Sequence, residues 1–158
     1  MQAIFQADVR GFKETSLEEL ITFRWIDYQL PDDERLYAHE IIEATLVNID
    51  AIDAQISERL VNWELTRISA VSRAILRTGI AQLIYLPKSA DAAVVIDEAI
   101  LLAKQYDALE AAAFINGLLD DLVRSTTKAP IKEPPKPKPL ATKIKIKKKT
   151  DFEKPLKS

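Results

Sequence analysis

The sequence contains no cysteine, and this absence excludes disulfide bonds and thiolate chemistry. Glycine occurs only at Gly11, Gly79 and Gly117, so no glycine-rich loop is present to cradle a phosphate. No apolar run approaches the roughly 18–20 residues that a membrane-spanning helix requires. Residues 1–15 also lack the apolar stretch of a secretory signal peptide. These absences predict a cytoplasmic protein that does not enter a membrane.

Side chains that commonly carry catalysis or hold metals are equally scarce. His39 is the only histidine, and its acidic neighbours on an expected helix favour a partly exposed surface position. No pair of carboxylates has a histidine or cysteine companion at metal-ligand spacing. The runs Asp32-Asp33-Glu34 and Asp120-Asp121 fit helix-start acids and solvated charges, because adjacent side chains on a helix diverge by about 100°. The sequence therefore predicts no enzyme, no metal, no cofactor and no small-molecule substrate.

Charge divides the chain into two parts. Residues 126–158 contain eleven lysines and three acidic residues, a net charge of +8, whereas residues 1–125 carry −10. Six of the eight prolines also lie in residues 126–158. A segment so rich in proline and lysine cannot bury enough apolar surface to offset its chain entropy. We therefore expect a folded domain over residues 1–125 and a disordered basic tail over residues 126–158.

Apolar residues of the first part recur at helical rather than strand spacing. Ser16, with Glu19 three residues later, has the pattern of a capping box, and Pro31 followed by acids suits the start of another helix. The expected helices cover residues 1–9, 17–26, 30–56 and 66–85, a span from Ser89 or Asp91 to Tyr106, and residues 111–124, with a short turn around Trp63 capped by Asn62. This pattern predicts an all-α bundle of about six or seven helices.

Residues 111–124, "AAAFINGLLDDLVR", combine a helical pattern with a turn signal. Asn116-Gly117 is a strong two-residue turn signal, and a glycine costs a helix about 1 kcal/mol relative to alanine. On a helical wheel, however, the apolar residues share one arc and this pair lies on the opposite side. We predict that the segment is helical, that Gly117 is a close packing contact, and that Asn116 hydrogen-bonds a neighbouring segment.

Three blocks of the second half resemble a known family. "WELTRISAVSRAILRTGIAQLIYLP" (63–87), "VIDEAILLAKQYD" (95–107) and "FINGLLD" (114–120) stand in the order and spacing of the bacterial transcription antitermination factor family NusB. The resemblance implies an all-helical, NusB-like bundle of two small helical halves. It also implies a non-catalytic role: binding the boxA element of nascent ribosomal RNA with the ribosomal protein NusE. That complex would join RNA polymerase and support rRNA transcription and maturation.

Departures from the family pattern bear on binding. NusB proteins usually begin with an arginine-rich stretch that runs into the first helix, whereas the first basic residue here is Arg10. We expect the natural start to lie upstream of Met1; loss of the arm is the alternative. Gln82 and Ala81 stand where the family commonly has Glu and Tyr, which weakens any NusE contact through them. Asp97 replaces the usual Asn, a smaller change.

RNA binding requires positive charge for phosphates and flat side chains for unstacked bases. Arg73 and Arg77 are i,i+4 neighbours and form the best basic strip of the folded part, with Arg67 further round; pairing with acids on the helix surface is the alternative. By the resemblance, Tyr106 and Phe114 flank a turn close to the RNA and could stack on bases. Their helical spacing also fits core positions, and for Phe114 the core is favoured.

Further residues are candidates for contacts around that turn. Glu110 lies within it, where a carboxylate would limit RNA affinity. The candidates for partner or packing contacts are Gln82, Asn116, Gly117 and Asp120.

The basic tail is a separate candidate. "KIKIKKK" (143–149) contributes Lys143, Lys145, Lys147, Lys148 and Lys149, which could hold phosphates without reading sequence. If the arginine-rich arm is absent, we hypothesise that this tail partly replaces it. The alternative is a solubilising extension that binds polyanions weakly.

Two other hypotheses about the function of the whole chain are possible alternatives. One is a NusB-like module such as the one that precedes the catalytic domain of some rRNA cytosine methyltransferases. The sequence shows no cofactor-binding domain after the module, and this disfavours an enzyme. The other is a helical interaction protein that keeps the ribosomal-protein contact but has lost specific RNA binding.

Overall fold

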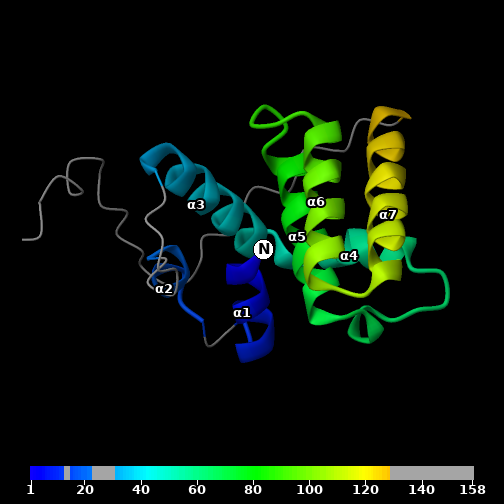
Figure 1. Ribbon diagram of the computed structural model, residues 1–158, viewed down its shortest axis with the longest axis horizontal. Helices are drawn as coiled ribbons and strands as arrows, with labels where there is room; N and C mark the ends of the chain where they lie inside the picture. Colours follow the sequence, from blue (N-terminus) through cyan, green and yellow to red (C-terminus); the bar gives the residue numbers. More distant parts are fainter. Residues whose placement is uncertain (13–14, 23–30, 129–158) are drawn as a thin grey trace, which may run out of the picture.

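The computed structural model of the chain describes residues 1–12, 15–22 and 31–128. Every regular element among these residues is a helix, which confirms the all-α prediction (Figure 1). The elements are α1 (Gln2–Arg10), α2 (Leu17–Ile21), α3 (Asp32–Val47), α4 (Ile49–Arg59), the 3₁₀ helix η1 (Leu65–Arg67), α5 (Ala70–Tyr85), α6 (Ala92–Tyr106) and α7 (Leu109–Lys128). Helix α7 thus extends past the predicted domain boundary at residue 125, and residues 129–158 lie outside the described part.

Capping residues define several of these helices. Ser16 caps α2, since its hydroxyl accepts a hydrogen bond from the backbone N–H of Glu19 at 3.2 Å, as the capping pattern predicts. The single helix expected over 30–56 is instead two helices that meet at Asn48. The Asn48 side chain donates to the carbonyl oxygen of Ala44 at 2.8 Å and so satisfies one of the groups left free at the end of α3.

The start of α5 also differs from the sequence prediction. The helix begins after Ser69, whose hydroxyl accepts from the backbone N–H of Ser72 at 2.9 Å. The residues before it form η1 and an irregular segment in which Asn62 has a positive φ of 64°, a conformation that asparagine tolerates better than most residues. The helix predicted from residue 66 is therefore one turn shorter at its start.

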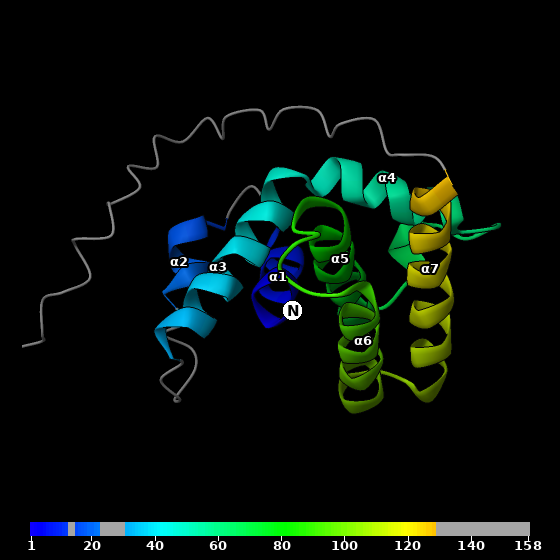
Figure 2. The same ribbon diagram turned by 90° about the horizontal axis from the view of Figure 1, so that it is seen from above.

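Helix α5 lies at the centre and packs against α1, α3, α4, α6 and α7 (Figures 1 and 2). A large apolar cluster joins α4, α5, α6 and α7, and a smaller one joins α1, α2 and α3 through Ala74 of α5. These clusters are the two helical halves that the family resemblance implied. Nine residues of α5 are buried but only two of the equally long α3, because α5 is covered by helices from both halves.

One glycine in α5 permits close helix packing. A Cβ placed on Gly79 would lie 3.3 Å from Cδ1 of Leu119, a fully buried residue of α7. That distance is tighter than most side-chain contacts, so the absence of a side chain at Gly79 lets α7 approach α5 closely.

Candidate nucleic-acid interface

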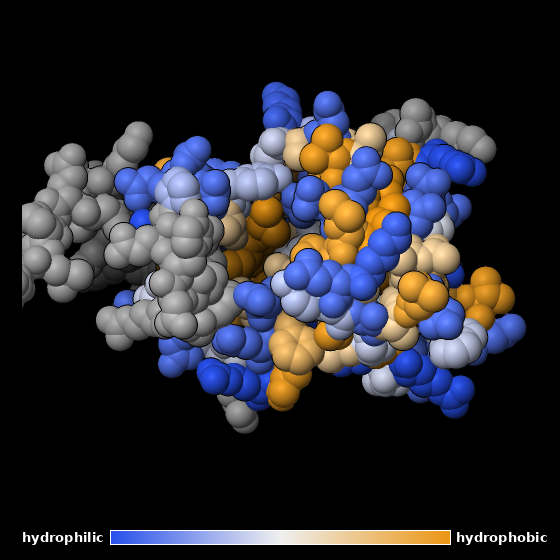
Figure 3. All heavy atoms as spheres, viewed as in Figure 1, coloured by the Kyte–Doolittle hydropathy of each residue, from blue (hydrophilic) through white to orange (hydrophobic). Residues whose placement is uncertain are grey.

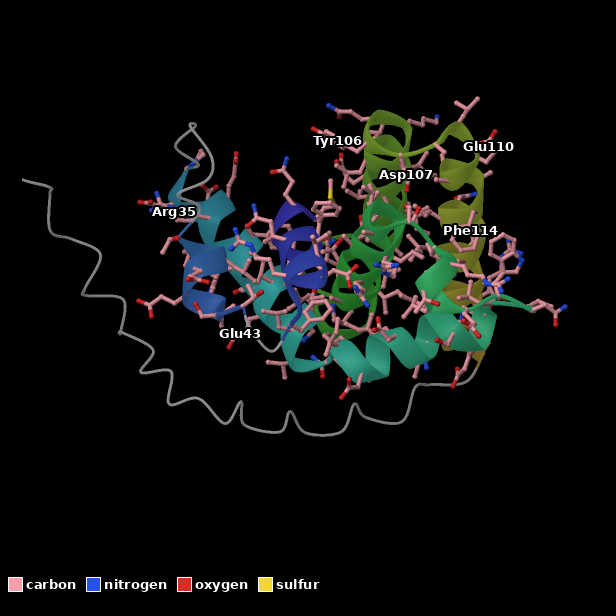
Figure 4. The ribbon with its side chains drawn as sticks, turned by 90° about the horizontal axis from the view of Figure 1, so that it is seen from below. Arg35, Glu43, Tyr106, Asp107, Glu110 and Phe114 are labelled. Atoms are coloured by element: carbon pink, nitrogen blue, oxygen red, sulfur yellow. The ribbon has the colours of Figure 1, made fainter. Side chains whose placement is uncertain are left out.

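The turn between α6 and α7 carries two exposed aromatic side chains. Tyr106 is the last residue of α6 and is 46% exposed, and Phe114 lies in the second turn of α7 and is 38% exposed. Figure 4 shows both on the same end of the molecule, on either side of the turn. The core position favoured for Phe114 is therefore wrong, because its place at the edge of the apolar arc leaves the ring partly in solvent. We call Tyr106 and Phe114 the aromatic surface.

The turn that carries the aromatic surface is fastened to the start of α5. One carboxylate oxygen of Asp107 accepts hydrogen bonds from the hydroxyls of Ser69 and Ser72 at 2.5 and 2.6 Å. The other accepts from the backbone N–H of Ala108 at 2.8 Å. The position also places a negative charge at the N-terminus of α5, where the helix dipole is favourable. Asp107 thus fixes the turn relative to the central helix.

This environment sets the protonation of Asp107. Burial of the carboxyl alone would raise its pKa, but the hydrogen bonds from Ser69, Ser72 and the backbone outweigh burial and hold the pKa of Asp107 below its usual range. The group is therefore a carboxylate at neutral pH, and its two oxygens act only as acceptors.

Arg73 and Arg77 point into the molecule rather than toward solvent. Arg73 donates to Asp8 of α1 through Nε and Nη2 at 2.9 and 2.6 Å. Arg77 pairs with Asp8 through Nη1 at 2.8 Å and holds both carboxylate oxygens of Asp53 in α4 at 2.7 and 2.8 Å. The Arg77 side chain is only 4% exposed. Both arginines are thus paired with acids, as the alternative had it, although the acids belong to two other helices. The two side chains do not form a basic strip on the surface.

We call Asp8, Asp53, Arg73 and Arg77 the ionic cluster. Burial alone would raise the pKa of Asp8, yet the hydrogen bonds and charges of the two arginines hold it below its usual range. The Arg77 guanidinium also lies 5.0 Å from the centre of the Phe12 ring, within cation–π range. The cluster connects α1, α4 and α5, so its role is to join the two helical halves.

The chain matches the sequence model of the NusB family over residues 1–124. The chain belongs to the NusB family. A transcription antitermination protein NusB from Leptospira biflexa serovar Patoc is 40% identical over 120 residues, which are 76% of this chain and 83% of that protein. The NusB of Sorangium cellulosum is 31% identical over 125 residues, 79% of this chain and 86% of its own length.

Solved NusB structures share the fold. NusB of T. maritima superposes with a TM-score of 0.70 at 32% identity, over 78% of this chain and 84% of that one. A chain in the crystal structure of the antitermination factors NusB and NusE in complex with dsRNA gives a TM-score of 0.65 at 28% identity, over 78% and 89% of the two chains. The NusB fold therefore covers both helical halves of this protein.

Gln82, a departure from the usual NusB sequence, has a partner inside the chain. The hydroxyl of Tyr37 in α3 donates to its Oε1 at 2.8 Å, and its Nε2 donates to the carbonyl oxygen of Thr78 at 3.1 Å. The side chain is half-buried between α3 and α5. In this member of the NusB family, Gln82 thus contributes to packing between two helices.

The outer side of α7 contradicts two predictions. Gly117 is exposed, and a Cβ built on it would meet nothing within 4 Å. The Asn116 side chain forms no hydrogen bond with any other described residue, and Asp120 pairs with Arg124 of the same helix at 3.3 Å. The predicted packing contact at Gly117 and the predicted tie through Asn116 are therefore wrong, because within the described chain no other segment covers this side of α7.

Other predicted features fall outside the description or have no counterpart in it. Lys143, Lys145, Lys147, Lys148 and Lys149 lie beyond the described residues. Among the residues that are described, no group of three or more His, Cys, Asp or Glu side chains converges to hold a metal ion. None of the described helices combines the length and hydrophobicity needed to span a bilayer.

Sequence reasoning missed the contact between Asp107 and the two serines. Ser69 is followed three residues later by Ser72, and a serine ahead of an apolar-periodic segment is itself a helix N-cap signal. The partner Asp107 stands 38 residues further along the chain from Ser69. No local pattern indicates that pairing, because it depends on how α6 packs against α5.

Proposed function

We propose that this protein is a transcription antitermination factor that binds boxA RNA together with NusE and joins the RNA polymerase antitermination complex. Membership of the NusB family supports this role, as does the likeness to a chain solved in a NusB, NusE and dsRNA complex. A cytoplasmic location, predicted from the sequence, accords with it.

The observation that carries the proposal is the aromatic surface. Tyr106 and Phe114 are large, exposed and flat, and they flank a turn that Asp107 holds in place. Unpaired RNA bases stack on such side chains, and each stacked base contributes about 1–3 kcal/mol of binding free energy. A rigid turn reduces the conformational entropy lost on binding, so the bond network of Asp107 supports affinity as well as fold.

The experiment measures fluorescence anisotropy of a labelled boxA RNA, with and without NusE. We expect NusE to strengthen RNA binding, and Tyr106→Ala and Phe114→Ala each to weaken it by roughly five- to hundredfold. Val94→Ala is the matched control, because Val94 is 52% exposed at the opposite end of α6. Equal affinities for all four proteins would overturn the proposal.

For protein partners, the proposed contact is the exposed side of α7. No described atom lies within 4 Å of the place where a Gly117 side chain would begin. The strip of Asn116, Gly117 and Asp120 therefore lets the backbone of another protein come close to α7. Gln82 is less suited to a direct contact, since both ends of its amide already have partners. A Gly117→Leu variant with reduced NusE affinity and unchanged RNA affinity supports a protein contact on this strip.

The lysine-rich tail belongs to the proposal as a phosphate-binding element. Each phosphate contact contributes about one unit to the slope of log affinity against log salt. Truncation after Lys128, where α7 ends, leaves every described helix intact. If Lys143, Lys145, Lys147, Lys148 and Lys149 hold phosphates, truncation lowers both RNA affinity and salt slope; unchanged values of both contradict a role for the tail.

A second candidate function is a helical interaction module that contacts NusE without specific RNA binding. The ionic cluster favours this second candidate. Its ion pairs remove Arg73 and Arg77 from the surface that RNA could reach, and residues 1–125 carry a net charge of −10. NusE binding by the full chain, with no boxA binding at any NusE concentration, selects this candidate.

A further inference from the structure

Exposed large hydrophobic side chains occur at the turn of the aromatic surface and on the α4–α5 connection that is hydrogen-bonded to it. Besides Tyr106 and Phe114, the strongly exposed ones there are Leu109 at the start of α7 and Val61 and Trp63 in the connection between α4 and α5. Figure 3 shows a further strip of hydrophobic side chains over α6 and α7, above the turn between these two helices. Trp63 is 64% exposed, which is unusual for the largest apolar side chain. Large apolar side chains that are this exposed are candidates for contact with a ligand.

The connection that carries Trp63 is held next to α7. At one end, Arg59 of α4 donates to Ser125 at 2.8 Å and pairs with Asp121 at 3.1 Å, both on α7. At the other end, Ser69 bonds to Asp107 in the turn before α7. Both ends of residues 60–68 are thus fastened to α7 or to its turn. Figures 1 and 4 show the connection beside α7, on the side where Phe114 lies.

The same connection presents an available arginine. Arg67, at the end of η1, is exposed, and its side chain forms no hydrogen bond or ion pair with another described residue. Arg59, Arg73, Arg77 and Arg124 are all paired with carboxylates. Because Arg67 precedes Ser69 by two residues, the bond between Ser69 and Asp107 keeps it close to the turn of the aromatic surface.

We propose that Trp63 and Arg67 form a second RNA-contacting element, in which Trp63 stacks on an unpaired base and Arg67 binds a phosphate. The element extends the aromatic surface from the α6–α7 turn onto the α4–α5 connection, so it rests on the proposed function. An exposed indole and an unpaired guanidinium on one short connection supply the stacking and the positive charge with which proteins bind single-stranded RNA. Glu64 and Glu110 are exposed nearby, which limits the electrostatic part of the affinity and leaves stacking as the main contribution.

Tryptophan fluorescence gives a direct readout of stacking. The chain has two tryptophans, Trp25 and Trp63, so a Trp25→Phe background leaves Trp63 as the single reporter. We expect boxA RNA to quench this fluorescence in proportion to binding. An RNA that binds without quenching overturns the stacking role of Trp63.

Substitutions then separate the two side chains. Trp63→Phe retains a flat ring and keeps most of the RNA affinity, whereas Trp63→Leu retains apolar area but lowers affinity about fivefold or more. Arg67→Ala lowers affinity and reduces the salt slope by about one unit, as loss of one phosphate contact requires. Arg124→Ala is the control for Arg67, since Arg124 is exposed but paired with Asp120. All sites are exposed, and thermal unfolding verifies that each variant is folded.

The outcomes distinguish this inference from the proposed function. If Tyr106→Ala and Phe114→Ala weaken RNA binding but changes at Trp63 and Arg67 do not, the second element is overturned and the proposed function stands. If Trp63→Leu and Trp63→Ala weaken NusE binding instead, the connection is a protein-contacting surface and the RNA role is overturned. If the unaltered chain with NusE does not bind boxA RNA, both proposals fail together.

Discussion

The ionic cluster and the aromatic surface differ from the rest of the molecule in the same way, because each places side chains at an exposure that is unusual for their type. Arginines, which mostly face water, are buried or half-buried at α5, and aromatic rings are exposed beside the α6–α7 turn. In the cluster, Asp8 and Asp53 compensate the buried charge, so the arginines join helices. At the turn, none of the described helices covers Tyr106 and Phe114, so their rings are available to a ligand. Burial, and not residue type, separates the stabilising region from the candidate binding region.

The largest expected effect is the loss of Arg77. An Arg77→Met variant leaves the half-buried Asp53 without its cation and Asp8 with Arg73 alone, and lowers the free energy of unfolding by about 3 kcal/mol. Denaturant unfolding measures this loss. The control Arg124→Ala, which removes an exposed i,i+4 pair, costs about 0.5 kcal/mol or less. If Arg77→Met is as stable as the unaltered chain, the ionic cluster does not hold the helical halves together.

Replacing Asp107 affects both regions, because the hydrogen bonds of this residue join the α6–α7 turn to α5. Asp107→Ala leaves the buried hydroxyl of Ser72 without an acceptor and lowers the free energy of unfolding by about 1–3 kcal/mol. It also loosens the turn beneath Tyr106, so we expect weaker RNA binding from the same variant. Stability and anisotropy measurements on one protein test both effects.

Acid provides an independent check on Asp107. Its pKa in the folded chain is below the unfolded value of about 3.9. Its stabilisation is therefore complete above the unfolded pKa and is lost as pH falls through the folded pKa. Asp107→Asn, which cannot ionise, removes this part of the acid sensitivity. An identical acid profile for Asp107→Asn contradicts the assigned bonds.

A smaller effect, of opposite sign, is expected at Gly117. Gly117→Ala adds a methyl group in open space on a helix and raises the free energy of unfolding by about 1 kcal/mol. The matched control is Gly79→Ala, where the new Cβ presses on Leu119 at 3.3 Å and the gain is reduced or reversed. Thermal unfolding of both variants measures the difference, and an equal gain at the two sites contradicts the close approach of α7 to α5.

The smallest change concerns the charge beside the aromatic surface. Glu110 is exposed at the start of α7, where its carboxylate repels phosphates. Glu110→Gln removes this repulsion and strengthens boxA binding by about two- to threefold, on the order of 0.5 kcal/mol at moderate salt. The same substitution at Glu40 of α3, also exposed, is the control. Increased affinity for both variants indicates a general charge effect and not a site at the turn.

Local sequence patterns account for much of the helical framework. The pattern at Ser16 predicted the cap of α2, and Pro31 with its acids predicted the start of α3. These signals act within a few residues of the chain, so they can be read without knowledge of the fold. The break at Asn48 and the late start of α5 were missed, because the apolar pattern continues across both places.

The sequence by itself determined that this protein is helical, that its charge is divided between an acidic body and a basic tail, and that its second half has the NusB pattern. Only the tertiary structure decided which special residues are covered. Gly79 and Gly117 both lie within helices, but only Gly79 is a point of close approach between two helices. The packing of the helices also placed Arg77 in the interior and Phe114 at the surface. The physical reason is that burial depends on contacts between helices far apart in the chain, which no local periodicity contains.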